Sequence, residues 1–258
     1  MNIRASFNFC FRSALRGILI LSGIVIALIA LSTIGCIVFD NFSVNYTGSY
    51  EMCAMIFVFV YACGAIRSGL RLANQCGRSR VSAFCAILLA LIATSAVCAV
   101  TCQLLSTIAS LVGRNLEGFT FASIWTMTYF GDFEPVHTLT FGEHIASVFG
   151  NFGVFTAASM CGVFCSALFY KIPSRWTAIA GIAFGVFIMM GIPTILSSLA
   201  LLANISSGFA AFLDALLHLV FDTPVNLAVS ALIGAAIVAG INYLLVRRVA
   251  VRAAGEKG

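Results

Sequence analysis

Charged residues are scarce in this chain, at 9% of its 258 residues, whereas apolar residues make up 61% and the mean hydropathy is +1.08. A water-soluble domain usually has about 25% charged residues. So little charge cannot cover a surface that faces water, which excludes an ordinary soluble protein. Ten-residue segments of alternating hydrophobicity, typical of membrane β-barrels, are also missing. The composition predicts an all-α integral membrane protein with one transmembrane domain, 1–258.

The motifs of common enzymes and pumps are absent as well. The sequence has no His-Glu-x-x-His, no Gly-x-Ser-x-Gly and no phosphate-binding Gly-x-x-x-x-Gly-Lys-Ser/Thr loop. We therefore predict no catalytic residue, no metal site and no cofactor on this chain. Asp214, His218 and Asp222 repeat at i, i+4 and i+8, so a helix would place them on one face. They could form a metal or proton site, although the polar face of an interfacial helix is the alternative we favour.

Ten cysteines are present, but no pair has Cys-x-x-Cys spacing. Most lie inside apolar runs, where cysteine behaves as a small hydrophobic residue. Cys36 and Cys53 lie near the outer ends of two predicted membrane spans. A disulfide between them and two free thiols both remain open, and free thiols are the interpretation we favour.

Six apolar segments are long enough to cross a bilayer, at roughly 17–39, 50–66, 83–106, 145–170, 177–202 and 227–246. Of the 14 Lys and Arg residues, all except Arg114 lie before the first span or after the second, fourth and sixth. Because positive loops stay in the cytoplasm, this bias predicts both termini inside. We expect a multi-pass protein of the cell membrane, the bacterial inner membrane.

The segment 2–16 precedes the first span and is amphipathic if helical. Ile3, Phe7, Cys10, Phe11 and Ala14 share one face. We predict an interfacial helix along the inner membrane surface with its basic side chains near anionic lipid headgroups; these are Arg4, Arg12 and Arg16. An ordinary basic tail is the alternative.

Two outer segments are too apolar for free loops. The first, 113–144, mixes aromatic and acidic residues as at a membrane interface, and Thr140 and Glu143 form a capping box that predicts the start of the fourth span. The second, 203–226, predicts re-entrant or interfacial helical elements before the last span. Within the fifth span, Gly181 and Gly185 predict close helix packing, and Pro193 predicts a kink.

A polar, basic segment, 67–82, separates the second and third spans. Topology alone could explain its arginines. Gly77 is suited to end one helix, and Ser79 to cap the next. A compact element of this kind could fit a groove on a cytoplasmic partner and transmit its movement.

The sequence QCGRSRVSAF at 75–84 resembles the segment QNGVSRKTFF, which follows the second span in small bacterial type-two ABC transporter permeases. Gln75, Gly77, Ser79 and Arg80 match it, whereas Cys76 and Arg78 depart from it. The sequence ALFYK at 167–171 is similar to the family's L-Y-Y-R. The resemblance extends over the whole chain in layout and over about fifteen residues in motif.

The resemblance implies the transmembrane subunit of an ATP-driven exporter. Separate ABC ATPase subunits would bind ATP and magnesium, and a second permease subunit, identical or related, would complete the path. The loop 67–82 would couple ATPase closure to the membrane through Arg71, Asn74, Gln75, Gly77, Arg78 and Arg80. The implied cargo is an antimicrobial peptide, a lipid or another amphipathic compound. A non-transporting binding, immunity or sensor subunit is the alternative. Membrane lipids are further expected partners, and nucleic acid is not.

Overall fold

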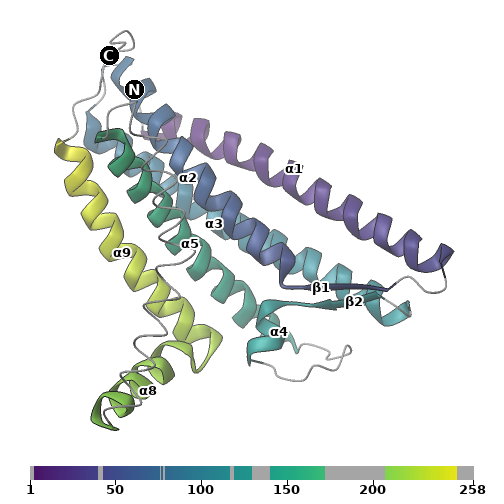
Figure 1. Ribbon diagram of the computed structural model, residues 1–258. Coiled ribbons are helices and arrows are strands. Elements are labelled where there is room, and N and C mark those ends of the chain that lie inside the picture. The colour runs from purple at the N-terminus through teal and green to yellow at the C-terminus, as the bar shows by residue number, and fades with distance from the viewer. Residues whose placement is uncertain are drawn as a thin grey trace.

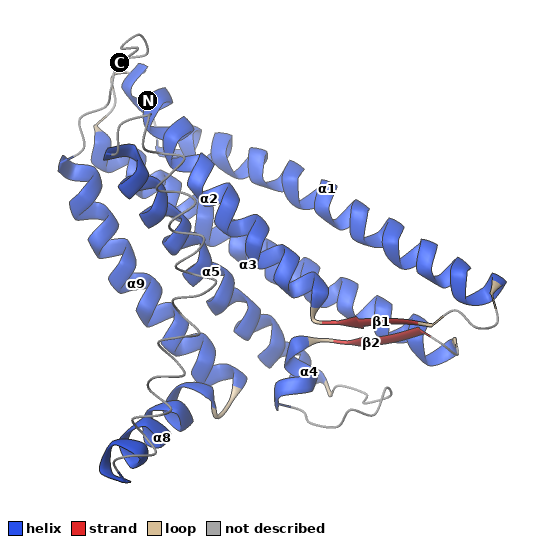
Figure 2. Ribbon diagram, in the orientation of Figure 1, coloured by secondary structure: helices blue, strands red, loops and turns tan. Residues whose placement is uncertain are grey.

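A computed structural model describes residues 3–39, 43–75, 77, 79–116, 119–129, 140–171 and 207–248 of the protein. Within these ranges the chain is helical apart from one short pair of strands (Figures 1 and 2). The elements are α1 (Ile3–Val38), β1 (Val44–Thr47), α2 (Ser49–Gln75), α3 (Arg80–Asn115), β2 (Phe119–Ala122), α4 (Ile124–Tyr129), α5 (Phe141–Lys171), α8 (Ser207–Phe221) and α9 (Pro224–Arg248).

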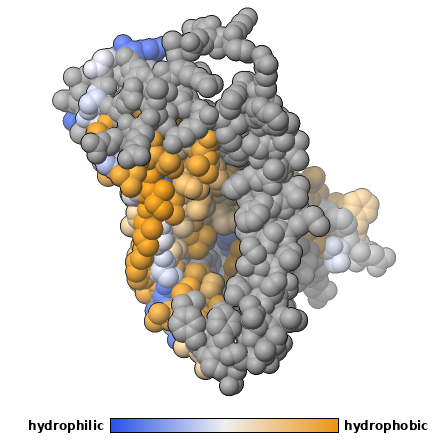
Figure 3. Space-filling view, turned by 60° about the vertical axis from the view of Figure 1, so that its left-hand side comes forward, coloured by the Kyte–Doolittle hydropathy of each residue, from blue (hydrophilic) through white to orange (hydrophobic). Residues whose placement is uncertain are grey.

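Five of these helices, α1, α2, α3, α5 and α9, are long and apolar enough to cross a membrane. Their outward faces carry many exposed large apolar side chains, and the described residues in Figure 3 form an apolar band with hydrophilic groups toward its ends. Both features are consistent with the predicted all-α membrane protein, because soluble monomers rarely expose large apolar surfaces. The predicted fifth span at 177–202, with Gly181, Gly185 and Pro193, lies outside the described residues.

The predicted interfacial helix and the first span form one continuous helix, α1. Cys10, Ala14 and Ile18 are buried at successive i, i+4 positions. Phe7 and Phe11 pack against a cluster that contains residues of α2 and α3. The amphipathic face that we predicted is therefore present, but it contacts protein. At about 1.5 Å per residue, α1 is about 54 Å long and exceeds the hydrocarbon core of a bilayer.

Small residues let α2, α5 and α9 approach closely. A Cβ atom at Gly162 would collide with the Phe59 carbonyl of α2, and one at Gly153 would lie 2.7 Å from Cα of Ala228 in α9. The Ser166 hydroxyl donates to the carbonyl of Cys63 at 2.8 Å. Asn242 Nδ2 donates to the Met160 carbonyl at 3.0 Å and joins α9 to α5. These contacts place α5 at the centre of the bundle.

The strands β1 and β2 form a parallel pair in register from Val44 opposite Phe119 to Thr47 opposite Ala122. The sequence analysis did not predict this pair. Each strand follows a helix, α1 or α3, that runs antiparallel to α2, so both connections return in the same direction and pair in parallel. The turn after β1 requires Gly48, which has φ +56° and whose N–H donates to the Ala122 carbonyl at 2.8 Å.

We expect Gly162→Leu to destabilise the protein by about 1–3 kcal/mol, because the new side chain must push α5 away from α2. Thermal unfolding of the detergent-solubilised protein would measure this loss. Gly23→Leu is the matched control, since a Cβ at Gly23 meets no atom within 4 Å. Equal melting temperatures for the two variants would contradict the close approach of α5 and α2.

Candidate functional site

A buried acid lies at the start of α2. Glu51 is in the first turn of this helix and is only 3% exposed. The Ser123 hydroxyl and the Ile124 N–H lie near its carboxyl group. Neither carboxyl oxygen has a hydrogen-bond partner among the described residues. The sequence analysis gave Glu51 no role and included it at the start of the second predicted span, 50–66. The structure instead encloses it beneath the segment that connects β2 to α4.

Hydrogen bonds connect the surroundings of Glu51 to α5. The Ser123 hydroxyl accepts from the Trp125 N–H at 3.2 Å, and the Trp125 indole Nε1 donates to Asn151 Oδ1 at 2.8 Å. The indole fits against α5 because residue 150 is glycine; a Cβ there would lie 2.5 Å from the ring. Tyr129 stacks on Trp125 with ring centroids 5.8 Å apart, and burial raises the pKa of the Tyr129 hydroxyl.

Further polar groups on α5 continue this polar cluster. His144 Nδ1 and Gln103 Nε2 lie 2.8 Å apart and join α5 to α3. Ser147 Oγ and Asn151 Nδ2 are buried and have no hydrogen-bond partner among the described residues. The cluster therefore combines satisfied contacts between helices with donors and acceptors that have no partner among the described residues. We name it the outer polar cluster: Glu51, Gln103, Ser123, Trp125, His144, Ser147 and Asn151.

The predicted coupling loop 67–82 is mostly helical. Arg71, Asn74 and the exposed Gln75 belong to the end of α2, and Arg80 begins α3. Gly77 has φ +63°, and Ser79 caps α3 by accepting from the Ser82 N–H at 3.3 Å, which confirms both predicted capping roles. Arg78 lies outside the described residues. The predicted loop is thus a tight turn between two long helices. α2 continues as far as Gln75, and α3 begins at Arg80.

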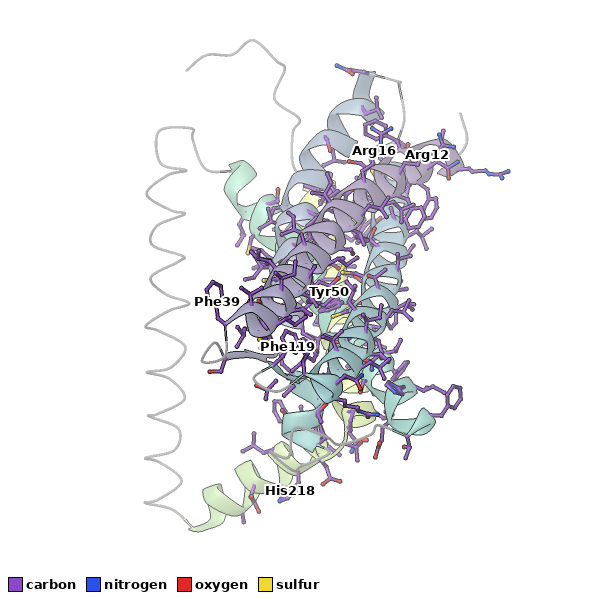
Figure 4. The ribbon with its side chains drawn as sticks, turned by 90° about the vertical axis from the view of Figure 1, so that its right-hand side faces the viewer. Arg12, Arg16, Phe39, Tyr50, Phe119 and His218 are labelled. Carbon is purple, nitrogen blue, oxygen red and sulfur yellow. The ribbon has the colours of Figure 1, made fainter. Side chains whose placement is uncertain are left out.

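Arg4, Arg12 and Arg16 are exposed on α1. Figure 4 shows Arg12 and Arg16 at the end of the molecule opposite His218, with Tyr50 and Phe119 between. Among the described residues, no carboxylate forms an ion pair with either arginine.

Asp214, His218 and Asp222 lie on one face of α8 and just beyond it, as predicted. The imidazole lies 3.8 Å from Asp214 and 3.9 Å from Asp222, and all three side chains are more than 60% exposed. Such an exposed arrangement favours the polar helix face over a buried site. In the described ranges no group of three His, Cys, Asp or Glu side chains could hold a metal ion. Cys36 and Cys53 are free thiols.

The capping box is confirmed, because Glu143 accepts from the Thr140 N–H at 2.6 Å where α5 begins. Two of the aromatic residues that were predicted for the membrane interface are placed differently. Phe119 and Trp125 are 1% and 3% exposed and pack inside the protein. The segment that contains them, β2 and α4, packs next to the start of α2. Space is available there because α1 and α3 are longer than α2.

Glu51 and Asn242 are among the buried polar residues that the sequence analysis did not single out. Asn242 was detectable as a lone amide inside the last apolar span, because such a group needs a partner in lipid. Glu51 gave no comparable sign, since an acid in the first turn of a helix is also favourable on a surface.

Comparison with protein-family models, curated proteins and solved structures gives no match for this chain.

We expect Glu51→Gln and Glu51→Leu to unfold at or above the temperature of the wild type. The buried carboxyl group has no hydrogen-bond partner among the described residues, so its burial costs free energy that both variants reduce. Thermal unfolding of both variants in the same detergent measures the difference. A Leu variant that loses more than about 1 kcal/mol would show that the carboxyl group stabilises the outer polar cluster.

Proposed function

We propose that this protein is the transmembrane subunit of an ATP-driven ABC exporter, coupled to a separate ATPase through the turn between α2 and α3. The motif resemblance at 75–84 supports this assignment. The geometry of that turn is the observation that carries it. Gly77 and Ser79 produce a tight, capped connection whose exposed Gln75 and Gly77 face away from the bundle.

The two helices beside the turn suit the transmission of movement. α2 and α3 contain 27 and 36 residues, and neither is interrupted. Ile87 of α3 packs against α2 at Gly69, and Cys102 of α3 lies in a cluster with Tyr50 at the other end of α2. A displacement of the turn by a partner would therefore act along α2 toward Gly48 and Glu51. The outer polar cluster lies at the end of α2 and α3 that is opposite the turn.

A sixth span between α5 and α9 is part of the proposal. Gly153 of α5 contacts Ala228 of α9, and Met160, later in α5, contacts Asn242, later in α9. The two helices therefore run in the same direction. Both helices end near the start of α1 (Figure 1). We infer that the apolar run 177–202, which is long enough to cross a bilayer, returns the chain to the other end.

The bundle interior favours an amphipathic or lipid-like cargo over an ionic one. Thr94 and Thr156 bond to carbonyls of their own helices, so these hydroxyls are not directed at a polar route. Unpartnered polar atoms among the described residues lie in the outer polar cluster and also at Ser22, Tyr50, Ser95, Tyr129 and Asn242. A peptide, a lipid or a drug-like compound of mixed polarity fits this distribution.

We expect the tagged protein, purified in mild detergent from its own host, to carry a P-loop ATPase in stoichiometric amount. Arg80→Glu should remove the ATPase and leave membrane insertion unchanged, because it reverses a charge at the proposed contact. Mass spectrometry of the co-purifying proteins is the measurement.

Arg114→Glu is the matched control, since it makes the same change at the opposite end of α3. A protein that purifies alone, or an ATPase retained equally by both variants, would contradict the coupling role. A different stoichiometric partner would instead favour the binding or sensor subunit.

We expect reporter domains fused after Gly258 and before Met1 to be active only in the cytoplasm. Both ends should give this result because the basic residues gather on that side. A reporter inserted near 131–139 is the control and should report the opposite side. A C-terminal fusion on the outer side together with an N-terminal fusion on the inner side would rule out six spans.

A further inference from the structure

A groove of about 290 Å³ lies between the first half of α1 and the second half of α2. Phe9, Cys10 and Ser13 line it from α1, and Tyr61, Gly64 and Ser68 are among its α2 residues. It is distinct from the outer polar cluster and from the turn between α2 and α3. Antiparallel contacts, Cys10 with Tyr61 and Gly17 with Phe57, place it toward the basic end of the bundle.

The lining of the groove is apolar with a few polar groups. Val60 and Ala65 add apolar surface, while the Tyr61 hydroxyl donates to the Cys10 carbonyl at 2.5 Å and joins the two helices. At Gly64 a Cβ would meet no atom within 4 Å, so the groove is open there. Such a mixture suits a molecule with an apolar chain and a polar end.

Two arginines border the groove on α1. Arg12 follows Phe9 by three residues, and Arg16 follows Ser13 by three, so each lies beside a lining residue on the helix surface. The two are themselves four residues apart, and like charges at this spacing repel each other. Because no described carboxylate pairs with them, an anion from outside the chain would relieve this repulsion.

We propose that the groove binds one anionic phospholipid of the inner leaflet, with its phosphate against Arg12 and Arg16 and an acyl chain beside Gly64. Basic side chains at the inner surface attract anionic headgroups. The groove makes the binding specific to one position, because it accepts the apolar part of the lipid whose headgroup the arginines attract. The proposal does not depend on ATPase coupling or on transport.

Two other occupants fit less well. The segment 249–258 of this chain has two basic residues and one acid, so it has the same sign of charge as the groove border. A second copy of the protein would bring its own Arg12 and Arg16 toward the same surface. A phospholipid supplies both the negative charge and the apolar chain.

Native mass spectrometry of the full-length protein in a neutral maltoside detergent tests the proposal. Phosphatidylglycerol and phosphatidylcholine with the same acyl chains are added at equal concentration. We expect one phosphatidylglycerol to be retained on the wild type. The Arg12→Gln/Arg16→Gln variant should bind it about 30-fold more weakly, from the attraction lost at two basic residues.

Gly64→Phe should also lose the lipid, because the ring fills the groove without meeting the backbone. Arg114→Gln and Gly23→Phe are the controls: one removes a charge at the other end, and the other adds a ring in open space on α1. Both should retain the lipid, and circular dichroism would establish that every variant keeps its helical content.

Equal retention of the two lipids, or retention by Gly64→Phe at the wild-type level, would overturn the proposal. A lipid-free dimer that Gly64→Phe separates into monomers would assign the groove to a second copy. Loss of lipid from both controls as well would show attachment without a defined site.

Discussion

Close contact of helix backbones is the constraint on which this bundle depends. Apolar side chains gain little by leaving lipid for one another, so packing and hydrogen bonds between helices must hold membrane helices together. Here Gly162 and Gly153 let α5 approach α2 and α9, and Ser166 and Asn242 add hydrogen bonds to backbone carbonyls at the same seams. Because α5 contacts both neighbours in this way, the positions of α2 and α9 follow from it.

The outer polar cluster depends on this arrangement. α1 and α3 extend beyond the start of α2, and β1, β2 and α4 occupy the space next to that start (Figure 1). Gly48 and Gly150 make that filling possible, the first by its left-handed backbone and the second by admitting the Trp125 ring. Glu51 becomes buried as a consequence. The cluster and the α2–α3 turn are therefore opposite ends of one pair of rigid helices.

Much of the fold could be predicted because its causes are local. Apolar runs predicted the five described membrane helices, and Gly77, Ser79 and the Thr140–Glu143 pair predicted helix ends. The strand pair could not be predicted, because Val44–Thr47 and Phe119–Ala122 are distant in sequence and acquire partners only from each other. The helix at 2–16 was predicted with its correct apolar face, but whether that face meets lipid or α2 depends on tertiary contacts.

Composition and charge distribution by themselves determined the class of this protein, since 9% charged residues cannot cover a water-facing surface and the basic residues alternate between the loops. Tertiary structure alone decided which polar residues are buried, where the chain folds back inside its helices, and which side of α1 forms a groove with α2. The physical reason is distance along the chain. Hydropathy and capping act within a few residues, whereas the burial of Glu51, the Trp125–Asn151 bond and the Gly162 contact join segments that only packing brings together.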